Sequence, residues 1–136
     1  MDKLNLLIAD DDSDDKELFI EVINELFPHI HCFTVSDGEE TLFFLEKIKD
    51  KIDYIFLDIN MPRLNGIECL TKIKLFDTYK NTPIIMYTTS CLEADKILAY
   101  QNGASYFLTK PVKFLDLKQS LYEIISKFNF KSNPSN

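Results

Sequence analysis

The sequence predicts an α/β protein in which a five-stranded parallel sheet carries helices on both faces. Five short apolar runs recur along the chain, and the stretches between them place apolar residues at helical spacing. The apolar runs are nearly continuous, which is typical of parallel strands that are covered on both faces. Because strands that alternate with helices are joined by right-handed crossovers, the five pairs predict a doubly wound sheet.

The predicted strands are short, and polar residues follow most of them. They are expected at Leu4–Ala9, His31–Val35, Tyr54–Leu57, Pro83–Thr88 and Ser105–Thr109. The natural arrangement of five such strands is the flavodoxin-like order 2-1-3-4-5, in which ligands bind at the carboxyl ends of the central strands. The residues that follow strands one, three, four and five are therefore the candidates for a site.

Five helices are expected, and capping or turn residues mark most of their ends. Ser13 is the expected N-cap of the first helix, which runs on to about Leu26. The second helix follows Ser36-Asp37-Gly38, the third follows Asn65-Gly66, the fourth ends at Asn102-Gly103, and the fifth extends from Phe114 to Phe128. Gly103 suits a helix end because glycine tolerates a positive φ.

Composition limits what the chain can be. Its 136 residues, 46% of them hydrophobic, suffice for one domain with a buried core, which we expect over residues 1–130, followed by a disordered polar tail over 131–136. The net charge is −7 and Arg63 is the single arginine, so direct binding of DNA or RNA is disfavoured. No apolar run approaches the roughly 20 residues that span a bilayer, and the first residues do not form a signal peptide. We therefore expect a cytoplasmic protein without membrane contact.

The residues after strands one, three, four and five form one set if the predicted sheet is right. They are Asp10-Asp11-Asp12, Asp58-Ile59-Asn60, Thr88-Thr89-Ser90 and Lys110-Pro111. Carboxylates, a carbonyl and water are ligands that octahedral Mg²⁺ prefers. A lysine supplies a point charge, and a threonine hydroxyl supplies a donor, for phosphoryl oxygens. The set predicts a site for a divalent cation and a phosphoryl group.

Five aspartates crowd the stretch LLIADDDSDD at the end of the first strand. Asp14 and Asp15 are expected in the first turn of a helix, where the macrodipole favours acids, and Asp12 lies at the margin. Asp10 and Asp11 are expected at the metal site, since a divalent cation offsets their repulsion. A calcium-binding EF-hand loop fits the stretch in part. However, an EF-hand has a helix where a strand is expected here, and a glycine where Asp15 stands.

Four segments together resemble the receiver domain of two-component response regulators, of the single-domain, CheY-like type. The segments are LLIADD, YIFLDINMPRLNGIE, PIIMYTT and GASYFLTKP, in this order and each at a predicted strand end. The resemblance covers about residues 3 to 128. It implies that Asp58 is the phosphoacceptor, that Asp11, Asp58 and the backbone carbonyl of Asn60 bind Mg²⁺ or Mn²⁺, and that Asp10 acts on the metal through water.

The same resemblance assigns the remaining site residues. It implies that Thr88 and Lys110 bind the phosphoryl oxygens and that Lys110 takes part in the catalysis. Thr88 and Phe107 would form the switch, since Thr88 moving toward the phosphoryl group leaves space for the ring. A cis peptide bond between Lys110 and Pro111 is also implied, and it would aim the lysine into the site.

The function that the resemblance implies is a phosphorylation-switched receiver. A sensor histidine kinase or a histidine phosphotransfer protein would supply the phosphoryl group, and a downstream target protein would contact the face formed by the fourth helix, fifth strand and fifth helix. The protein would catalyse only its own phosphorylation and dephosphorylation, so we do not expect an enzyme with a separate substrate. A monomer or weak homodimer is expected.

Other functions stay open at this point. The protein could instead be a phosphorelay carrier or phosphate sink that passes the group to a histidine phosphotransfer protein. A haloacid-dehalogenase-type phosphatase needs a second acid two residues after its nucleophile, and Asn60 stands there. A flavodoxin-like FMN binder needs a hydroxyl- or glycine-rich loop after the first strand, where this chain has aspartates that repel phosphate.

Overall fold

The computed structural model describes residues 3–131, with side chains as far as residue 128. Its strands are β1 (Leu4–Ala9), β2 (Ile30–Val35), β3 (Tyr54–Leu57), β4 (Ile84–Thr88) and β5 (Tyr106–Thr109). Its helices are α1 (Ser13–Leu26), α2 (Gly38–Lys47), α3 (Gly66–Ile73), α4 (Glu93–Gln101) and α5 (Phe114–Lys131), with a short 3-10 helix at Asp77–Tyr79. All the predicted elements are present, and three strands begin one residue away from the predicted start.

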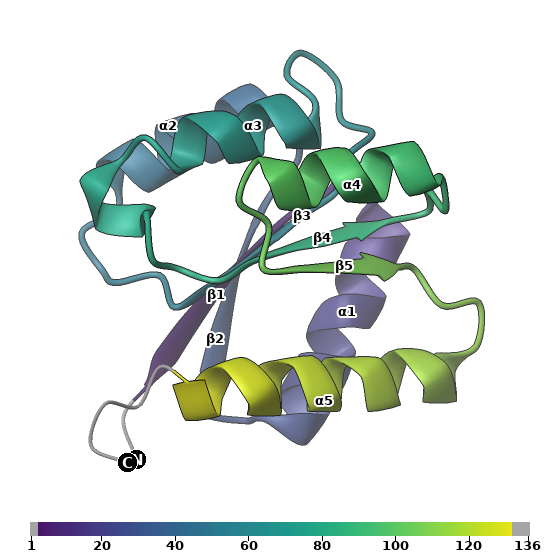
Figure 1. The fold of residues 1–136 in the computed structure, drawn as a ribbon. Helices are drawn as coiled ribbons and strands as arrows, with labels where there is room; N and C mark the ends of the chain where they lie inside the picture. Colours follow the sequence, from purple (N-terminus) through teal and green to yellow (C-terminus); the bar gives the residue numbers. More distant parts are fainter. Residues whose placement is uncertain (1–2, 132–136) are drawn as a thin grey trace.

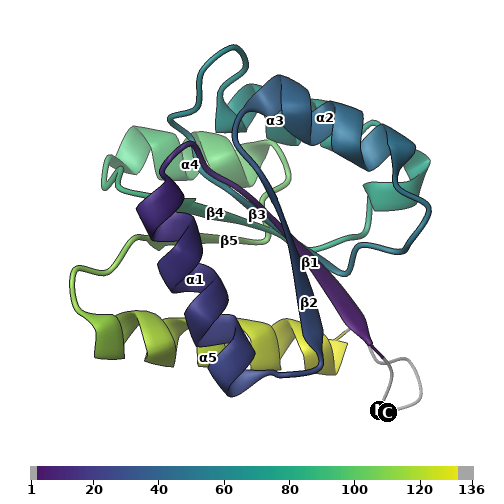
Figure 2. The same cartoon turned by 180° about the vertical axis from the view of Figure 1, so that it is seen from behind.

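The five strands form one parallel sheet in the predicted order β2-β1-β3-β4-β5. Three helices, α2, α3 and α4, cover one face, and α1 and α5 cover the other, as Figures 1 and 2 show from opposite sides. β1 is buried on both faces, which explains its continuous apolar sequence. Leu7 and Ala9 pack on the α2–α4 side, whereas Leu6 and Ile8 pack on the α1–α5 side.

The loop from β1 into α1 is shaped by a helix cap. The predicted N-cap, Ser13, was wrong: it is the first residue of α1, and the N-cap is Asp12, whose side chain accepts a hydrogen bond from the backbone N–H of Asp15 at 3.0 Å. A carboxylate in extended backbone satisfies this free N–H as a serine would. The segment before the loop is a strand, so the EF-hand alternative was wrong as well.

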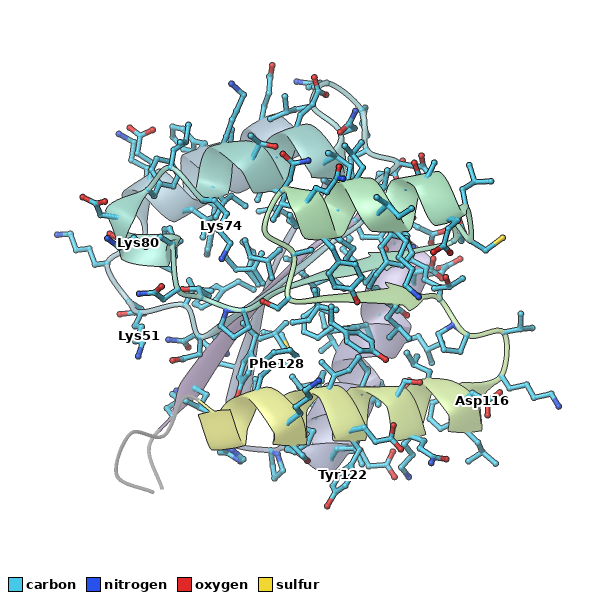
Figure 3. All side chains as sticks on the ribbon, viewed as in Figure 1. Lys51, Lys74, Lys80, Asp116, Tyr122 and Phe128 are labelled. Atoms are coloured by element: carbon cyan, nitrogen blue, oxygen red, sulfur yellow. The ribbon has the colours of Figure 1, made fainter. Side chains whose placement is uncertain are left out.

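Helix α5 closes the α1–α5 side of the sheet. Its Phe128 points toward the strands and is buried, whereas Tyr122 points away from the sheet and is exposed (Figure 3). The helix continues to Lys131, the first residue of the expected tail, and the rest of that tail lies outside the described residues. Within the described part of the chain, no helix is long and apolar enough to cross a membrane.

Candidate functional site

Ladder hydrogen bonds continue one residue beyond the ends of three strands and fix the backbone of the candidate residues. The N–H of Asp10 donates to Val35 O at 3.1 Å, and the N–H of Asp58 donates to Ala9 O at 3.0 Å. The N–H of Lys110 donates to the carbonyl of Thr88 at 2.7 Å. The sheet therefore holds these residues at its carboxyl edge, where a ligand site is expected.

The ammonium group of Lys110 lies among three carboxylates. Its Nζ lies 2.6 Å from Asp10 Oδ2, 2.8 Å from Asp15 Oδ2 and 3.1 Å from Asp58 Oδ2. The side chain of Lys110 is only 8% exposed, and its Nζ also lies 5.4 Å from the centroid of the Tyr87 ring. The sheet edge thus joins Lys110 to two of the three predicted acids, Asp10 and Asp58, and to a third carboxylate, that of Asp15, which the sequence did not indicate.

The third acid corrects one prediction. Asp15 does lie in the first turn of α1, but it is more than an acid at a helix start because it binds Lys110. Nothing in the sequence pairs these residues, which are 95 positions apart.

The predicted cis bond before Pro111 was also wrong, since the described residues contain no cis peptide bond. With a trans bond, the side chain of Lys110 already reaches the carboxylates from the end of β5.

Burial and charge shift two pKa values in the site. Burial raises the pKa of Asp10 to about 6, although hydrogen bonds from Lys110 and from the N–H of Asp12 act in the opposite direction. Burial alone would lower the pKa of Lys110. Its hydrogen bonds with Asp10 and Asp15 and the charge of Asp58 outweigh that effect, so the pKa lies above its ordinary value. Lys110 is therefore a permanent cation at neutral pH.

The carboxylates can also hold a metal ion. One oxygen from each of Asp10, Asp11 and Asp58 lies within 4.8 Å of the other two, with Asp10 and Asp58 buried and Asp11 exposed. Hard oxygen ligands with one side open to water suit Mg²⁺, which keeps several waters when it binds protein. The donor set fits the predicted cation. The N–H of Asn60 donates to Asp58 Oδ1 at 3.1 Å, which orients the carboxylate between the backbone and Lys110.

The predicted switch residues lie on the α2–α4 face of the sheet. Thr88 is fully buried, and its Oγ1 accepts a hydrogen bond from the N–H of Ser90 at 3.3 Å. Phe107 on β5 pairs in register with Met86, two residues before Thr88, so Phe107 and Thr88 are diagonal neighbours on one face. The ring is buried. A contact that the sequence did not indicate holds this strand: the Phe107 N–H donates to the hydroxyl of Tyr100, on α4, at 3.0 Å.

The loop after β3 passes very close to the phosphoacceptor candidate. The N–H of Gly66 donates to Ile59 O at 2.9 Å, and a Cβ at Gly66 would lie 2.2 Å from the carbonyl oxygen of Asp58. Only glycine allows this approach. The sequence indicated Gly66 as a helix start but gave no sign of its contact with the site.

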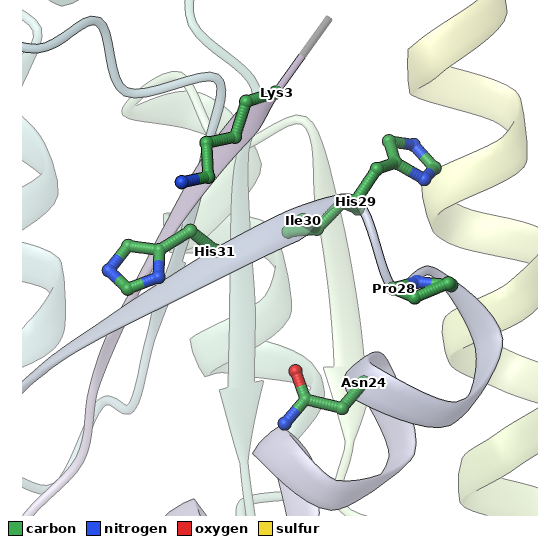
Figure 4. Close-up of a pocket in the computed structure, with 6 residues that line it drawn as sticks. All are labelled: Lys3, Asn24, Pro28, His29, Ile30 and His31. Carbon is green, nitrogen blue, oxygen red and sulfur yellow. The ribbon is translucent and has the colours of Figure 1, made fainter. Parts of the chain in front are cut away.

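Among the described residues, no second cluster of potential metal ligands lies at the opposite edge of the sheet. A hollow of about 410 Å³ lies near the amino ends of β1 and β2 and is lined by Lys3, Asn24, Pro28, His29, Ile30 and His31. His29 lies in the turn before β2 and His31 lies on the strand, and their rings point away from each other (Figure 4). They do not converge on one ligand.

Comparison with known proteins agrees with this geometry. Residues 6–122 match the model of the response regulator receiver domain. The chain belongs to this family. A chemotaxis protein CheY homolog of Campylobacter jejuni is 30% identical over 122 residues, which are 90% of this chain and 92% of that protein. The transcriptional regulatory protein CpxR of Escherichia coli is 30% identical over 131 residues, 96% of this chain, but the chain spans only 53% of CpxR.

Solved receiver structures share the whole described fold. The phosphorylated cyanobacterial phytochrome response regulator RcpA has a TM-score of 0.88 and 25% identity, covering 96% of this chain and 97% of RcpA. The Mn²⁺-bound response regulator Rcp1 has a TM-score of 0.81 and 28% identity, covering 90% of this chain and 92% of Rcp1. The predicted fold and the predicted family are confirmed, and the family favours a receiver over a phosphatase or an FMN binder.

Proposed function

We propose that this receiver accepts a phosphoryl group on Asp58 in a Mg²⁺-dependent reaction and thereby switches a protein-binding surface. The observation that carries the proposal is the environment of the Asp58 carboxylate. It is buried at the sheet edge, with one oxygen on the N–H of Asn60, the other on Lys110, and Asp10 and Asp11 close enough to share a cation. The phosphorylated state of RcpA and the Mn²⁺ bound to Rcp1 support it by analogy.

The chemistry is governed by charge. The Asp58 carboxylate attacks the phosphorus of a phosphohistidine, a P–O bond forms while the P–N bond breaks, and the imidazole leaves with the electron pair. Both reactants are anionic, so their repulsion is the main barrier that the site must lower. Lys110 is fixed beside Asp58 and stays cationic, so it can bind an oxygen of the incoming group. Mg²⁺ bound by the acids would supply further positive charge.

The switch is a population shift between two packings of the α2–α4 face. A phosphoryl group on Asp58 offers new acceptor oxygens, and the buried Thr88 hydroxyl can turn to donate to one of them. Phe107, its diagonal neighbour, lacks a phenolic hydroxyl, so packing alone decides the position of its ring. Phosphorylation acts only through its different interaction with the two packings. The Tyr100 hydroxyl links the same strand to α4, which carries the change to the surface.

The output surface is the face formed by α4, β5 and α5. It exposes large apolar side chains from α4 and its N-cap, from the loop into α5 and from the first turn of α5, among them Leu92, Ile97, Tyr100, Val112 and Leu115. Exposed apolar side chains that gather on one surface mark contacts with other proteins. A downstream target would bind there, and a sensor histidine kinase would supply the phosphoryl group in the cytoplasm. The protein then modifies only itself and has no separate substrate.

The test is phosphorylation of the purified chain by acetyl phosphate with Mg²⁺, followed by phosphate-affinity electrophoresis. We expect a shifted band for the wild type and for Asp116→Asn, an exposed acid on α5, and no shift for Asp58→Asn or with EDTA. A shifted band in Asp58→Asn would overturn the assignment. A phosphorelay carrier stays the second candidate, and transfer of the group from Asp58 to a histidine phosphotransfer protein would establish it.

A further inference from the structure

Three carboxylates surround the ammonium group of Lys110. It donates hydrogen bonds to Asp15 Oδ2 at 2.8 Å and Asp58 Oδ2 at 3.1 Å, and it forms an ion pair with Asp10 Oδ2 at 2.6 Å. Under the proposed function, Asp58 is the nucleophile and Asp10 serves the metal site, whereas Asp15 has no part. A phosphoryl oxygen that binds Lys110 therefore competes with these carboxylates for the ammonium group.

We propose that Asp15 competes with the phosphoryl group for Lys110 and thereby slows the phosphorylation of Asp58. This inference rests on the proposed function and adds a regulating side chain to it. In the unphosphorylated protein Asp15 occupies one donor of the lysine. When the phosphoryl group arrives, Asp15 releases the lysine and its carboxylate turns toward water.

Burial decides which of the three carboxylates yields. The side chain of Asp10 is fully buried and that of Asp58 is 7% exposed, whereas that of Asp15 is 36% exposed. A carboxylate that loses its cation inside the protein keeps a large desolvation penalty, but one at the surface is hydrated again. The backbone need not move, because the N–H of Asp15 stays bound to the N-cap side chain of Asp12.

Asp15 slows the phosphorylation of Asp58 in two ways. Its carboxylate occupies a donor that the phosphoryl group needs, and its negative charge repels the phosphoryl oxygens. Asn at this position keeps the shape and removes the charge, so it weakens the competition. Asp10 and Asp58 still hold the ammonium in place. The lysine should therefore stay in the site of an Asp15→Asn variant, with one donor more readily available.

Asp14 provides a matched control. It lies in the same first turn of α1 and is exposed, and within the described residues its side chain makes no hydrogen bond or ion pair. Asp14→Asn therefore removes the same charge from the same helix end without touching Lys110. We expect Asp15→Asn to react with acetyl phosphate about three- to tenfold faster than Asp14→Asn, the range expected for one charge-assisted hydrogen bond at a partly exposed site. Asp15→Glu, which keeps the charge beside Lys110, should stay within about twofold of the wild-type rate.

Two further readouts separate competition from a general effect on folding. The Mg²⁺ affinity of Asp15→Asn, measured by calorimetry, should match that of Asp14→Asn within about twofold, since Asp15 is outside the carboxylate cluster. In the metal-free protein, the Cε resonance of Lys110 should shift in Asp15→Asn and stay in place in Asp14→Asn.

The outcomes are distinct from those that test the proposed function. If Asp58 is phosphorylated but Asp15→Asn is no faster than Asp14→Asn, the inference is wrong and the proposed function stands. A slower reaction in Asp15→Asn would show that Asp15 holds Lys110 in the productive position, which also overturns it. If the wild type takes up no phosphoryl group, the proposed function itself fails.

Discussion

Replacing Gly66 with alanine should damage the site directly, because this glycine packs against the backbone of the proposed phosphoacceptor. A Cβ there would lie 2.2 Å from the carbonyl oxygen of Asp58 and 2.8 Å from Cα of Ile59. Ordinary contact begins at 3.4 Å, so the two segments must separate by about 1 Å. The atoms that obstruct the methyl group are backbone, and β3 holds them in the sheet, so a side-chain rotation cannot relieve the clash.

Separating Gly66 from the backbone of Asp58 should lower the stability of the protein, and it should lower the rate of phosphorylation even more. Overpacking of this kind costs about 1 to 3 kcal/mol of unfolding free energy. A misplacement of about 1 Å in a reacting group can reduce a rate about a hundredfold. We expect Gly66→Ala to remain folded, with a melting temperature about 3 to 10 °C lower. Its rate of phosphorylation by acetyl phosphate should fall by at least about thirtyfold. Urea unfolding measures the free energy of unfolding, thermal unfolding measures the melting temperature, and the phosphate-affinity gel measures the rate of phosphorylation.

Gly103→Ala is the control, because it also destabilises the fold but lies away from the site. Gly103 has a φ of 104°, so alanine there is strained, while the nearest side-chain atom is the flexible Cγ of Lys74 at 3.3 Å. We expect a loss of about 1 to 3 kcal/mol with a rate within about twofold of the wild type. A folded Gly66→Ala protein that is phosphorylated as fast as Gly103→Ala would show that the contact between Gly66 and Asp58 does not position the phosphoacceptor.

Two other predictions concern the buried acid and the link between α4 and β5. Since burial raises the pKa of Asp10 to about 6 without metal, Mg²⁺ must displace a proton below that pH. Calorimetry should show an affinity that rises as pH increases to about 6 and then levels off; a flat profile between about pH 5 and 7 would contradict this. Removing the hydroxyl in Tyr100→Phe leaves the Phe107 N–H without its acceptor and should cost about 1 kcal/mol. Faster amide exchange at Phe107 should accompany the loss, whereas Tyr122→Phe, which keeps its ring stacked on Phe27, should change neither.

The residues at the strand ends were predictable because their position follows from the chain's periodicity. Continuous apolar strands that are separated by helices along the chain predict a parallel sheet. A parallel sheet brings the carboxyl ends of its strands to one edge. The sequence alone therefore places Asp10, Asp58 and Lys110 together, and the structure joins all three. The cap of α1 could not be fixed in this way, because Asp12 and Ser13 are both good N-cap residues and only the backbone conformation selects Asp12.

The fold class, the strand order and the family follow from the amino-acid sequence, since each depends on local patterns or on short motifs in a fixed order. Three contacts could be found only from the folded chain: the carboxylates around Lys110, the approach of Gly66 to Asp58, and the hydrogen bond from β5 to Tyr100. These contacts join segments that share no local pattern. Periodicity specifies which face of an element is buried, whereas a single hydrogen bond depends on atomic positions to within a fraction of an ångström, and the packing of the whole domain sets those positions.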